Sequence, residues 1–196
     1  MAIAEGILLP LQRLQYRHDE LAHSDILGLP LKERVQHMVL HFFKYAGRIE
    51  DARLDGSRAV LRATLIDAFI ICMASANALG VSLGQYIPEC IDDGTFDSLA
   101  RIMGKRLAGK DLAAEALSAF LSSGGKMAKA VESLDHQERG PNWREEAERH
   151  LVALTRAVIA LLGCVGGDIE HDLRARLHEV EGRSFSVFLR TPEALK

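Results

Sequence analysis

LRATLIDAFIICMASANAL, at residues 61–79, is apolar on nearly every side when it is drawn as a helix. A helix of this kind is buried on all sides in a folded protein, so the stretch predicts the central helix of a helical core. Gly80 follows directly and is expected to end the helix as a C-cap. Asp67, in the middle of the stretch, needs a hydrogen-bonding or ionic partner because an isolated buried carboxylate is costly.

The sequence on both sides of this helix is also helical in pattern. Residues 31–51 place apolar side chains at helical spacing on one broad face, and Gly56 and Ser57 then interrupt the helical pattern. No stretch alternates polar and apolar residues for long enough to predict a strand, so the predicted fold class is all-α. Residues 23–30 are predicted to form a loop. The other predicted helices cover residues 11–22 after Pro10, 96–107, 111–135 with a weak point at Gly124-Gly125, 143–165 behind an Asn142 cap, and 169–180.

Length and composition are those of an ordinary globular chain. The 196 residues are 48% hydrophobic and 26% charged, and residues 1–196 are predicted to form a single domain. A net charge of −3 favours neither nucleic acid nor an anionic membrane as a partner, and we expect no apolar run long enough to span a bilayer. Three widely spaced cysteines, Cys72, Cys90 and Cys164, are expected to be reduced core residues, which predicts a cytoplasmic protein.

Two segments of the chain resemble each other. KYAGRIEDARLD at 44–55 can be aligned with KMAKAVESLDHQ at 126–137, and each is followed by an apolar helix and a glycine stop. A lone helical hairpin cannot bury its apolar face, so two stacked copies predict a helical bundle with a four-helix core. The first repeat covers about residues 31–90 and the second about residues 111–178.

A helical hairpin whose buried second helix carries one Asp, followed by a Gly and a short amphipathic segment, resembles the MazG-like all-α NTP pyrophosphohydrolase superfamily. This superfamily includes the dimeric dUTPases, and the resemblance covers the architecture from about residue 31 to residue 177. It implies hydrolysis of nucleoside triphosphates to monophosphate and pyrophosphate with Mg²⁺, which an E-E-x-x-E motif and an E-x-x-D motif hold between two helices. The resemblance also implies that relatives build the bundle by forming oligomers. A tandem duplication would supply the two halves of such a bundle within one chain.

This chain departs from the superfamily at nearly every metal-binding position. In the first repeat Lys44 and Tyr45 replace the paired glutamates and Arg48 replaces the third. Asp67 is the one acid retained there. The corresponding positions of the second repeat hold Lys126, Met127, Ala130 and, in place of the aspartate, Ala153. Because a lysine and an arginine repel a divalent cation, we expect neither a metal nor another cofactor at this place.

Lys44 and Arg48, one turn apart on the preceding helix, are the expected partners of Asp67. One interpretation is a structural ion pair in place of a metal site. The other is a surplus of positive charge that binds an anion such as the phosphates of a nucleotide, for which Lys and Arg are suited. A narrow stripe on this helix, which faces either solvent or Asp67, consists of His37, His41, Lys44 and Arg48.

His37 and His41 also have the spacing at which two imidazoles share a transition metal. Asp67 would be the third ligand of such a site. The neighbouring Lys44 opposes a cation there, so the metal is a third interpretation of the stripe, beside a solvated basic face and an anion site.

Three functions follow as hypotheses. The first is a superfamily member without hydrolytic activity that binds a nucleotide or another phosphate-bearing small molecule, and its candidate ligand-binding residues are His41, Lys44, Tyr45, Arg48 and Asp67. The second is an active pyrophosphohydrolase that holds Mg²⁺ on a rearranged set of acids, drawn from Glu50, Asp51, Asp67, Glu132 and Asp135. The third is a structural or partner-binding helical protein, and an apolar helix face would join its copies into a homo-oligomer.

Overall fold

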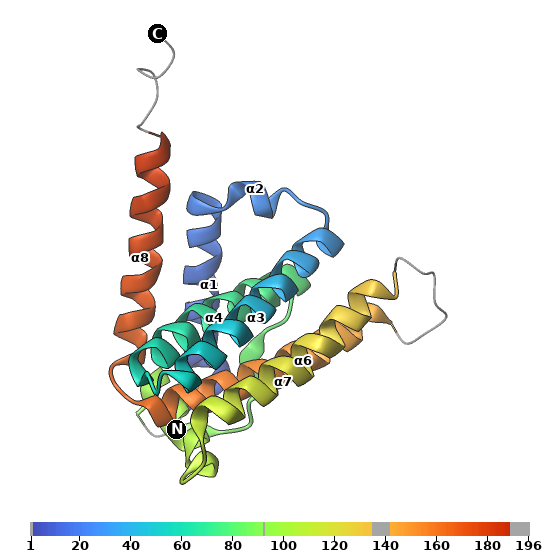
Figure 1. Cartoon of the computed structure of the whole chain (residues 1–196). Coiled ribbons are helices and arrows are strands. Elements are labelled where there is room, and N and C mark those ends of the chain that lie inside the picture. Colours follow the sequence, from blue (N-terminus) through green and yellow to red (C-terminus); the bar gives the residue numbers. More distant parts are fainter. Residues whose placement is uncertain (1, 92, 135–141, 189–196) are drawn as a thin grey trace.

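A computed structural model describes residues 2–91, 93–134 and 142–188, and in them the protein is a bundle of α-helices (Figure 1). Its elements are, in chain order, β1 (Ala2–Ile3), α1 (Ala4–Ala22), α2 (Ser24–Leu27), α3 (Leu31–Leu54), α4 (Arg58–Leu79), the 3-10 helix η1 (Leu83–Tyr86), β2 (Cys90–Ile91), α5 (Phe96–Gly104), the 3-10 helix η2 (Lys105–Leu107), α6 (Leu112–Glu132), α7 (Trp143–Val165) and α8 (Ile169–Phe188). The hairpins α3–α4 and α6–α7 pack against each other, and α1 and α8 lie side by side against α4. The two-residue strands β1 and β2 form one antiparallel pair. The all-α prediction is thus confirmed.

Helix α4 begins and ends at local signals. At its N-terminus the Ser57 hydroxyl accepts a hydrogen bond from the Val60 N–H at 3.3 Å. At its C-terminus Gly80 has a left-handed φ of 70°, and the Val81 N–H donates to the Ala76 carbonyl at 2.8 Å. This pattern is a Schellman C-cap, in which only glycine is free of Cβ strain. The predicted glycine stop is confirmed.

Helix α1 begins at Ala4 rather than at Leu11, and Pro10 lies inside it. The predicted boundary was wrong because Pro10 was taken as the start of the helix. Ile7 and Leu8 are buried in the core, so their packing offsets the backbone hydrogen bond that a proline cannot donate.

Three further boundaries differ from the prediction. The short helix α2 occupies part of the loop predicted at 23–30, and α8 continues to Phe188 rather than ending at Val180. Helix α6 passes through Gly124-Gly125 without a break. Gly124 is buried and faces α3. A Cβ added at Gly124 would lie 3.7 Å from the Cβ of Phe42, so the two helices pack closely here, and this packing keeps the segment helical.

Two pairs of buried aromatic rings join the hairpins to their neighbours. Phe42 on α3 meets Phe120 on α6 edge to face, with ring centroids 6.3 Å apart. Phe69 on α4 stacks on Phe96 of α5 with centroids 4.9 Å apart. Aromatic pairs of this geometry contribute about 0.5–1.5 kcal/mol beyond the burial of their area.

By length and apolar composition alone, α4 is long enough to cross a membrane, contrary to the expectation from the sequence. In the described part of the chain, α7 and the first part of α8 pass the same test only as a pair bent by 111°. A share of 61% of the apolar window of α4 is buried inside the protein, as in the core helix of a helical bundle. One helix of this kind is weak evidence for a membrane span.

Asn77 on α4 holds α1 in place. Its side-chain amide donates to the Gln15 side-chain oxygen at 2.8 Å and to the Gln12 carbonyl at 2.9 Å. The Gln12 amide in turn donates to the Val81 carbonyl at 2.9 Å and accepts from the Leu83 N–H at 2.9 Å. These buried bonds fix the rotation of α1, and they direct its later turns toward α3 and α8.

The contact between α5 and α7 predicts the effect of one substitution. A Cβ added at Gly163 would lie 2.0 Å from the Ala100 carbonyl oxygen, so the backbones of the two helices must separate in Gly163→Ala. We expect the free energy of unfolding, measured by urea denaturation, to fall by about 1–3 kcal/mol. Gly125→Ala is the matched control, because a Cβ there meets nothing within 4 Å. An equal loss in both variants would contradict the close approach.

Candidate functional site

Helices α1, α3, α4 and α8, together with the α1–α2 junction, line a cavity of about 340 Å³. Part of its wall is apolar and consists of Ile70, Ile71, Ala74, Leu177 and Val180. The polar side chains gather on two sides, around Asp67 and around Asp19. Asn77, which bonds to the α1 residue Gln15, lies ten residues beyond Asp67, or about 15 Å along the axis of α4.

All five candidate ligand-binding residues line this one cavity. They are His41, Lys44, Tyr45, Arg48 and Asp67. The basic stripe on α3 therefore faces Asp67 on α4 rather than solvent alone, which is the arrangement that the anion-binding interpretation needs.

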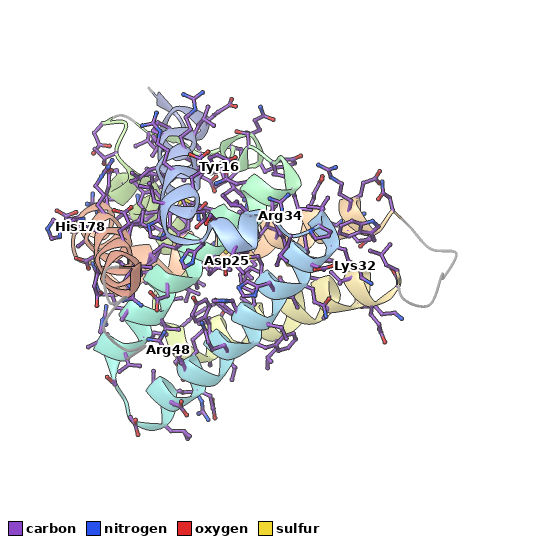
Figure 2. All side chains as sticks on the ribbon, turned by 90° about the horizontal axis from the view of Figure 1, so that it is seen from above. Tyr16, Asp25, Lys32, Arg34, Arg48 and His178 are labelled. Carbon is purple, nitrogen blue, oxygen red and sulfur yellow. The ribbon has the colours of Figure 1, made fainter. Side chains whose placement is uncertain are left out.

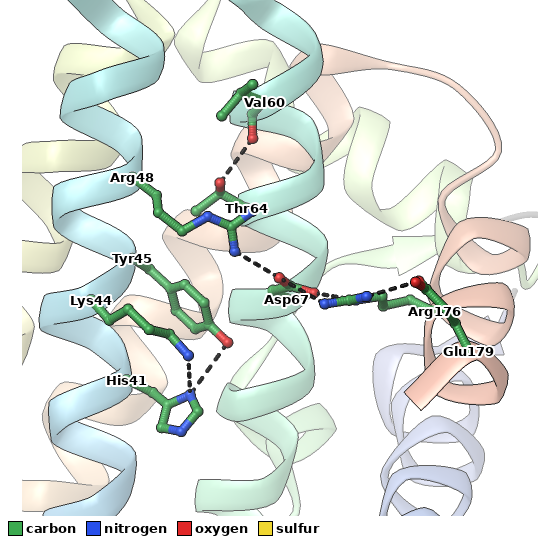
Figure 3. A network of polar contacts seen from close by, with 9 residues as sticks. All are labelled: His41, Lys44, Tyr45, Arg48, Val60, Thr64, Asp67, Arg176 and Glu179. Atoms are coloured by element: carbon green, nitrogen blue, oxygen red, sulfur yellow. Dashed lines mark hydrogen bonds and ion pairs between the residues drawn. The ribbon is translucent and has the colours of Figure 1, made fainter. Parts of the chain in front are cut away.

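Asp67 is held between two arginines (Figure 3). Arg48 Nη1 on α3 donates to Asp67 Oδ2 at 2.8 Å, and Arg176 Nε on α8 donates to Asp67 Oδ1 at 2.7 Å. The Asp67 side chain is 12% exposed, so this carboxylate is largely removed from water. The hydrogen bond to Asp67 also raises the pKa of Arg176, which keeps that guanidinium charged.

The expected pairing of Lys44 with Asp67 was wrong. Lys44 Nζ lies 3.0 Å from His41 Nδ1 and 4.8 Å from the centre of the Tyr45 ring. Arg176 takes the place that Lys44 was expected to fill, because the guanidinium reaches Asp67 from α8 with a planar pair of donors.

His41 is neutral in the folded protein at neutral pH. Burial lowers the pKa of its imidazole to about 4, and the charges of Lys44 and His37 lower it further in the same direction. Its Nδ1 also lies 3.4 Å from the Tyr45 hydroxyl. Burial, with a contribution from Asp67, raises the pKa of Tyr45, so the phenol keeps its proton. Burial lowers the pKa of Lys44.

The Asp67 side of the cavity carries surplus positive charge. Lys44, Arg48 and Arg176 face one largely buried carboxylate, and the second acid, Glu179, binds Arg176 from the exposed rim at 2.8 Å. Within the described residues Arg48 bonds only to Asp67, and its side chain is 39% exposed. Donors of this arginine and of Lys44 thus remain accessible to an anion.

The Asp19 side was not predicted from the sequence. It brings together His18 and Asp19 near the end of α1, His23 at the start of α2, and Glu181 on α8, which accepts from His18 Nδ1 at 3.1 Å. Burial raises the pKa of Asp19, and the nearby Gln15 amide, His23 and His18 partly offset this shift. Asp19 and His23 are one helical turn apart, and this spacing was the sequence signal from which the pair could have been predicted.

The acids of the hydrolase hypothesis do not converge in the described part of the chain. Glu50 pairs with Arg53 on the outer face of α3, and Asp51 is exposed. Glu132 pairs with Lys129 on α6, and Asp135 lies outside the described residues. None of these lines the cavity with Asp67.

The alternative metal set and the second repeat give no site either. Among the described residues, His37, His41 and Asp67 do not come within reach of one ion. In the second hairpin Lys126 is exposed while Met127 is buried in the core, and neither lines the cavity.

No protein-family model matches this chain, and neither a curated protein nor a solved structure matches it significantly. The resemblance to the MazG-like superfamily thus stays a hypothesis drawn from the sequence.

The twofold pairing of Asp67 predicts a loss of stability in Asp67→Asn. The amide cannot neutralise Arg48 and Arg176, and it replaces two charge-assisted hydrogen bonds by weaker ones. We expect the free energy of unfolding in urea to fall by about 1.5–3 kcal/mol. Asp51→Asn, on the exposed face of α3, is the control and should change it little. Equal stabilities of the two variants would refute a central role for these ion pairs.

The lowered pKa of His41 predicts a pH-dependent stability. In the unfolded chain the imidazole has its ordinary pKa of 6.5, so the unfolded state takes up a proton first as the pH falls. Protonation of His41 therefore costs the protein no stability above pH 6.5. The free energy of unfolding decreases as the pH falls from 6.5 toward 4. Unfolding free energies at pH 7.5 and pH 5 should therefore differ less in His41→Gln than in the wild type.

The control for this measurement is His178→Gln. His178 is 90% exposed on the outer side of α8, away from the cavity (Figure 2). Its removal should leave the wild-type pH dependence in place. A His41→Gln variant that loses as much stability on acidification as His178→Gln would contradict the assignment.

Proposed function

We propose that this protein binds a phosphate-bearing small molecule, such as a nucleotide, on the Asp67 side of the cavity without hydrolysing it. The observation that carries the proposal is the group of Lys44, Arg48 and Arg176 around a single largely buried carboxylate. Asp67 and the rim acid Glu179 together carry one negative charge fewer than the three cations, and a phosphate would complete the balance.

The side chains suit a phosphate in type as well as in charge. The ammonium of Lys44 acts as a compact point charge, and the accessible edge of Arg48 offers the planar donor pair that fits two phosphate oxygens. The apolar wall of Ile70 and Ile71 next to these cations would contact the less polar part of the ligand. The cavity volume of about 340 Å³ lies at the lower end of the range for small-molecule sites.

The packing of two helical hairpins supports a relationship to the MazG-like superfamily. Helices α3–α4 and α6–α7 form the hairpins, which correspond to the two repeats in the sequence. If this relationship holds, Lys44, Tyr45 and Arg48 stand at the positions of the superfamily's metal-binding acids, and all three line the cavity. On this view the anion site lies where relatives hold Mg²⁺, and the loss of the acids removes the hydrolytic metal.

Lys44→Ala combined with Arg48→Ala tests this proposal. Thermal unfolding is followed with nucleoside mono-, di- and triphosphates, each with and without Mg²⁺. A ligand that binds the native state raises the midpoint by mass action, so the wild type should be stabilised without metal and the double variant should lose the shift. Arg53→Ala combined with Lys126→Ala removes the same charge outside the cavity and should keep it.

Two results would contradict the proposal. Equal stabilisation of the Lys44/Arg48 variant and the wild type would show that the ligand binds elsewhere. A shift that requires Mg²⁺, together with release of pyrophosphate, would favour the active pyrophosphohydrolase instead.

A further inference from the structure

The Asp19 side of the cavity holds side chains that the phosphate-binding proposal does not use. One ligand atom each from His18, Asp19 and His23 lies within 4.8 Å of the other two. In the part of the chain that the structure describes, no other three His, Cys, Asp or Glu residues meet in this way. Ligand atoms bound to one zinc ion lie about 3–3.5 Å apart, so small side-chain rotations would bring the three together around an ion.

The backbone places these three residues at a helix junction. His18 and Asp19 belong to the last turns of α1, and the His23 N–H donates to the Asp19 carbonyl at 2.9 Å. The His23 carbonyl accepts from the Ile26 N–H at 3.0 Å, which starts α2. His23 is therefore bonded to both helices, and its imidazole lies 5.5 Å from that of His18, measured between ring centres.

Glu181 orients His18 from a different helix. His18 is 3% exposed, and its Nδ1 lies 3.1 Å from Glu181 Oε1 on α8. A carboxylate that accepts from one ring nitrogen leaves the lone pair on the other nitrogen. This carboxylate–histidine arrangement is the usual outer-shell support of a metal-bound imidazole.

The local charge favours a cation. Asp19 is 9% exposed, and no Lys or Arg of the described residues forms an ion pair with it. The carboxylate of Asp67, by contrast, is neutralised by two arginines. A buried carboxylate beside two imidazoles and a second acid lacks a full counter-charge, which a bound metal would supply.

The Gln15 amide is near enough to Asp19 to lower the pKa of that carboxyl, yet it has no well-formed hydrogen bond there. Its side chain is fully buried and lines the cavity, and its Nε2 has no hydrogen-bond partner among the described residues. A buried amide donor without a partner is costly. A metal-bound water or a ligand atom next to Asp19 would accept this hydrogen bond.

We propose that His18, Asp19 and His23 form a transition-metal site, with Glu181 as the residue that positions His18. Two imidazoles and one carboxylate suit Zn²⁺ and related first-row metals, whereas Mg²⁺ and Ca²⁺ prefer oxygen ligands alone. Three protein ligands leave a coordination position for water or a ligand atom. The site does not depend on the phosphate proposal, since it involves neither Lys44 nor Arg48.

Zinc binding by the tag-free full chain, in phosphate-free buffer, tests the site. The chain is titrated in competition with a chromophoric chelator, and we expect one Zn²⁺ per chain. Glu181→Gln should weaken binding by about 10–100-fold, and the loss of a ligand in His23→Gln should weaken it at least as much. His37→Gln is the control, because His37 lines the same cavity outside the three ligands and should leave the affinity unchanged.

Cobalt substitution keeps the test decisive if a variant folds poorly. In the wild type, Co²⁺ bound by nitrogen and oxygen ligands should give visible d–d bands without the near-ultraviolet thiolate band. A thiolate band would assign the metal to one of the three cysteines and overturn the proposal. The absence of stoichiometric zinc binding, or an unchanged affinity in folded His23→Gln and Asp19→Asn, would overturn it as well.

Discussion

The two ion pairs of Asp67 are the constraint on which the cavity depends. A carboxylate in the middle of the most apolar helix must be neutralised, and the bundle does so with Arg48 from α3 and Arg176 from α8. Buried ion pairs of this kind add little net stability, but they fix geometry because breaking one leaves a charge without a partner. Three helices that line the cavity are thereby joined at one point (Figure 3).

Local signals in the sequence were sufficient for most of the helices but not for their assembly. Gly80 ends α4 and Asn142 caps α7 as predicted, because a cap depends only on residues within one turn. Pro10 misled the prediction for α1, where packing against the core outweighs a local penalty. Four of the five candidate residues lie on α3, and Asp67 lies on α4, the next helix of the same hairpin. Helical spacing was therefore enough to predict that they lie close together. Arg176 is 109 residues from Asp67, and the spacing of residues within a helix cannot predict a contact between such distant positions.

The charges in the cavity are arranged with opposite sign along its length. Cations gather around Asp67, while Asp19 lies near His18 and His23. Glu181 bonds to His18, and neither Asp19 nor Glu181 forms an ion pair with an arginine or lysine in the described chain. His41, which is neutral, lies next to Lys44 on the Asp67 side. Lys44 and Arg48 extend from α3 into the cavity rather than into the core, so their charges affect what the cavity attracts.

The proposed binding of a phosphate by Lys44 and Arg48 next to Asp67 is tested most directly by arginine side-chain NMR. The Nε–Hε resonances are followed while a nucleoside triphosphate is added in the absence of metal. The account predicts saturable shifts at Arg48 and Arg176, with the resonances of Arg53 and other arginines outside the cavity unchanged. No saturable shift, or shifts confined to arginines outside the cavity, would contradict it.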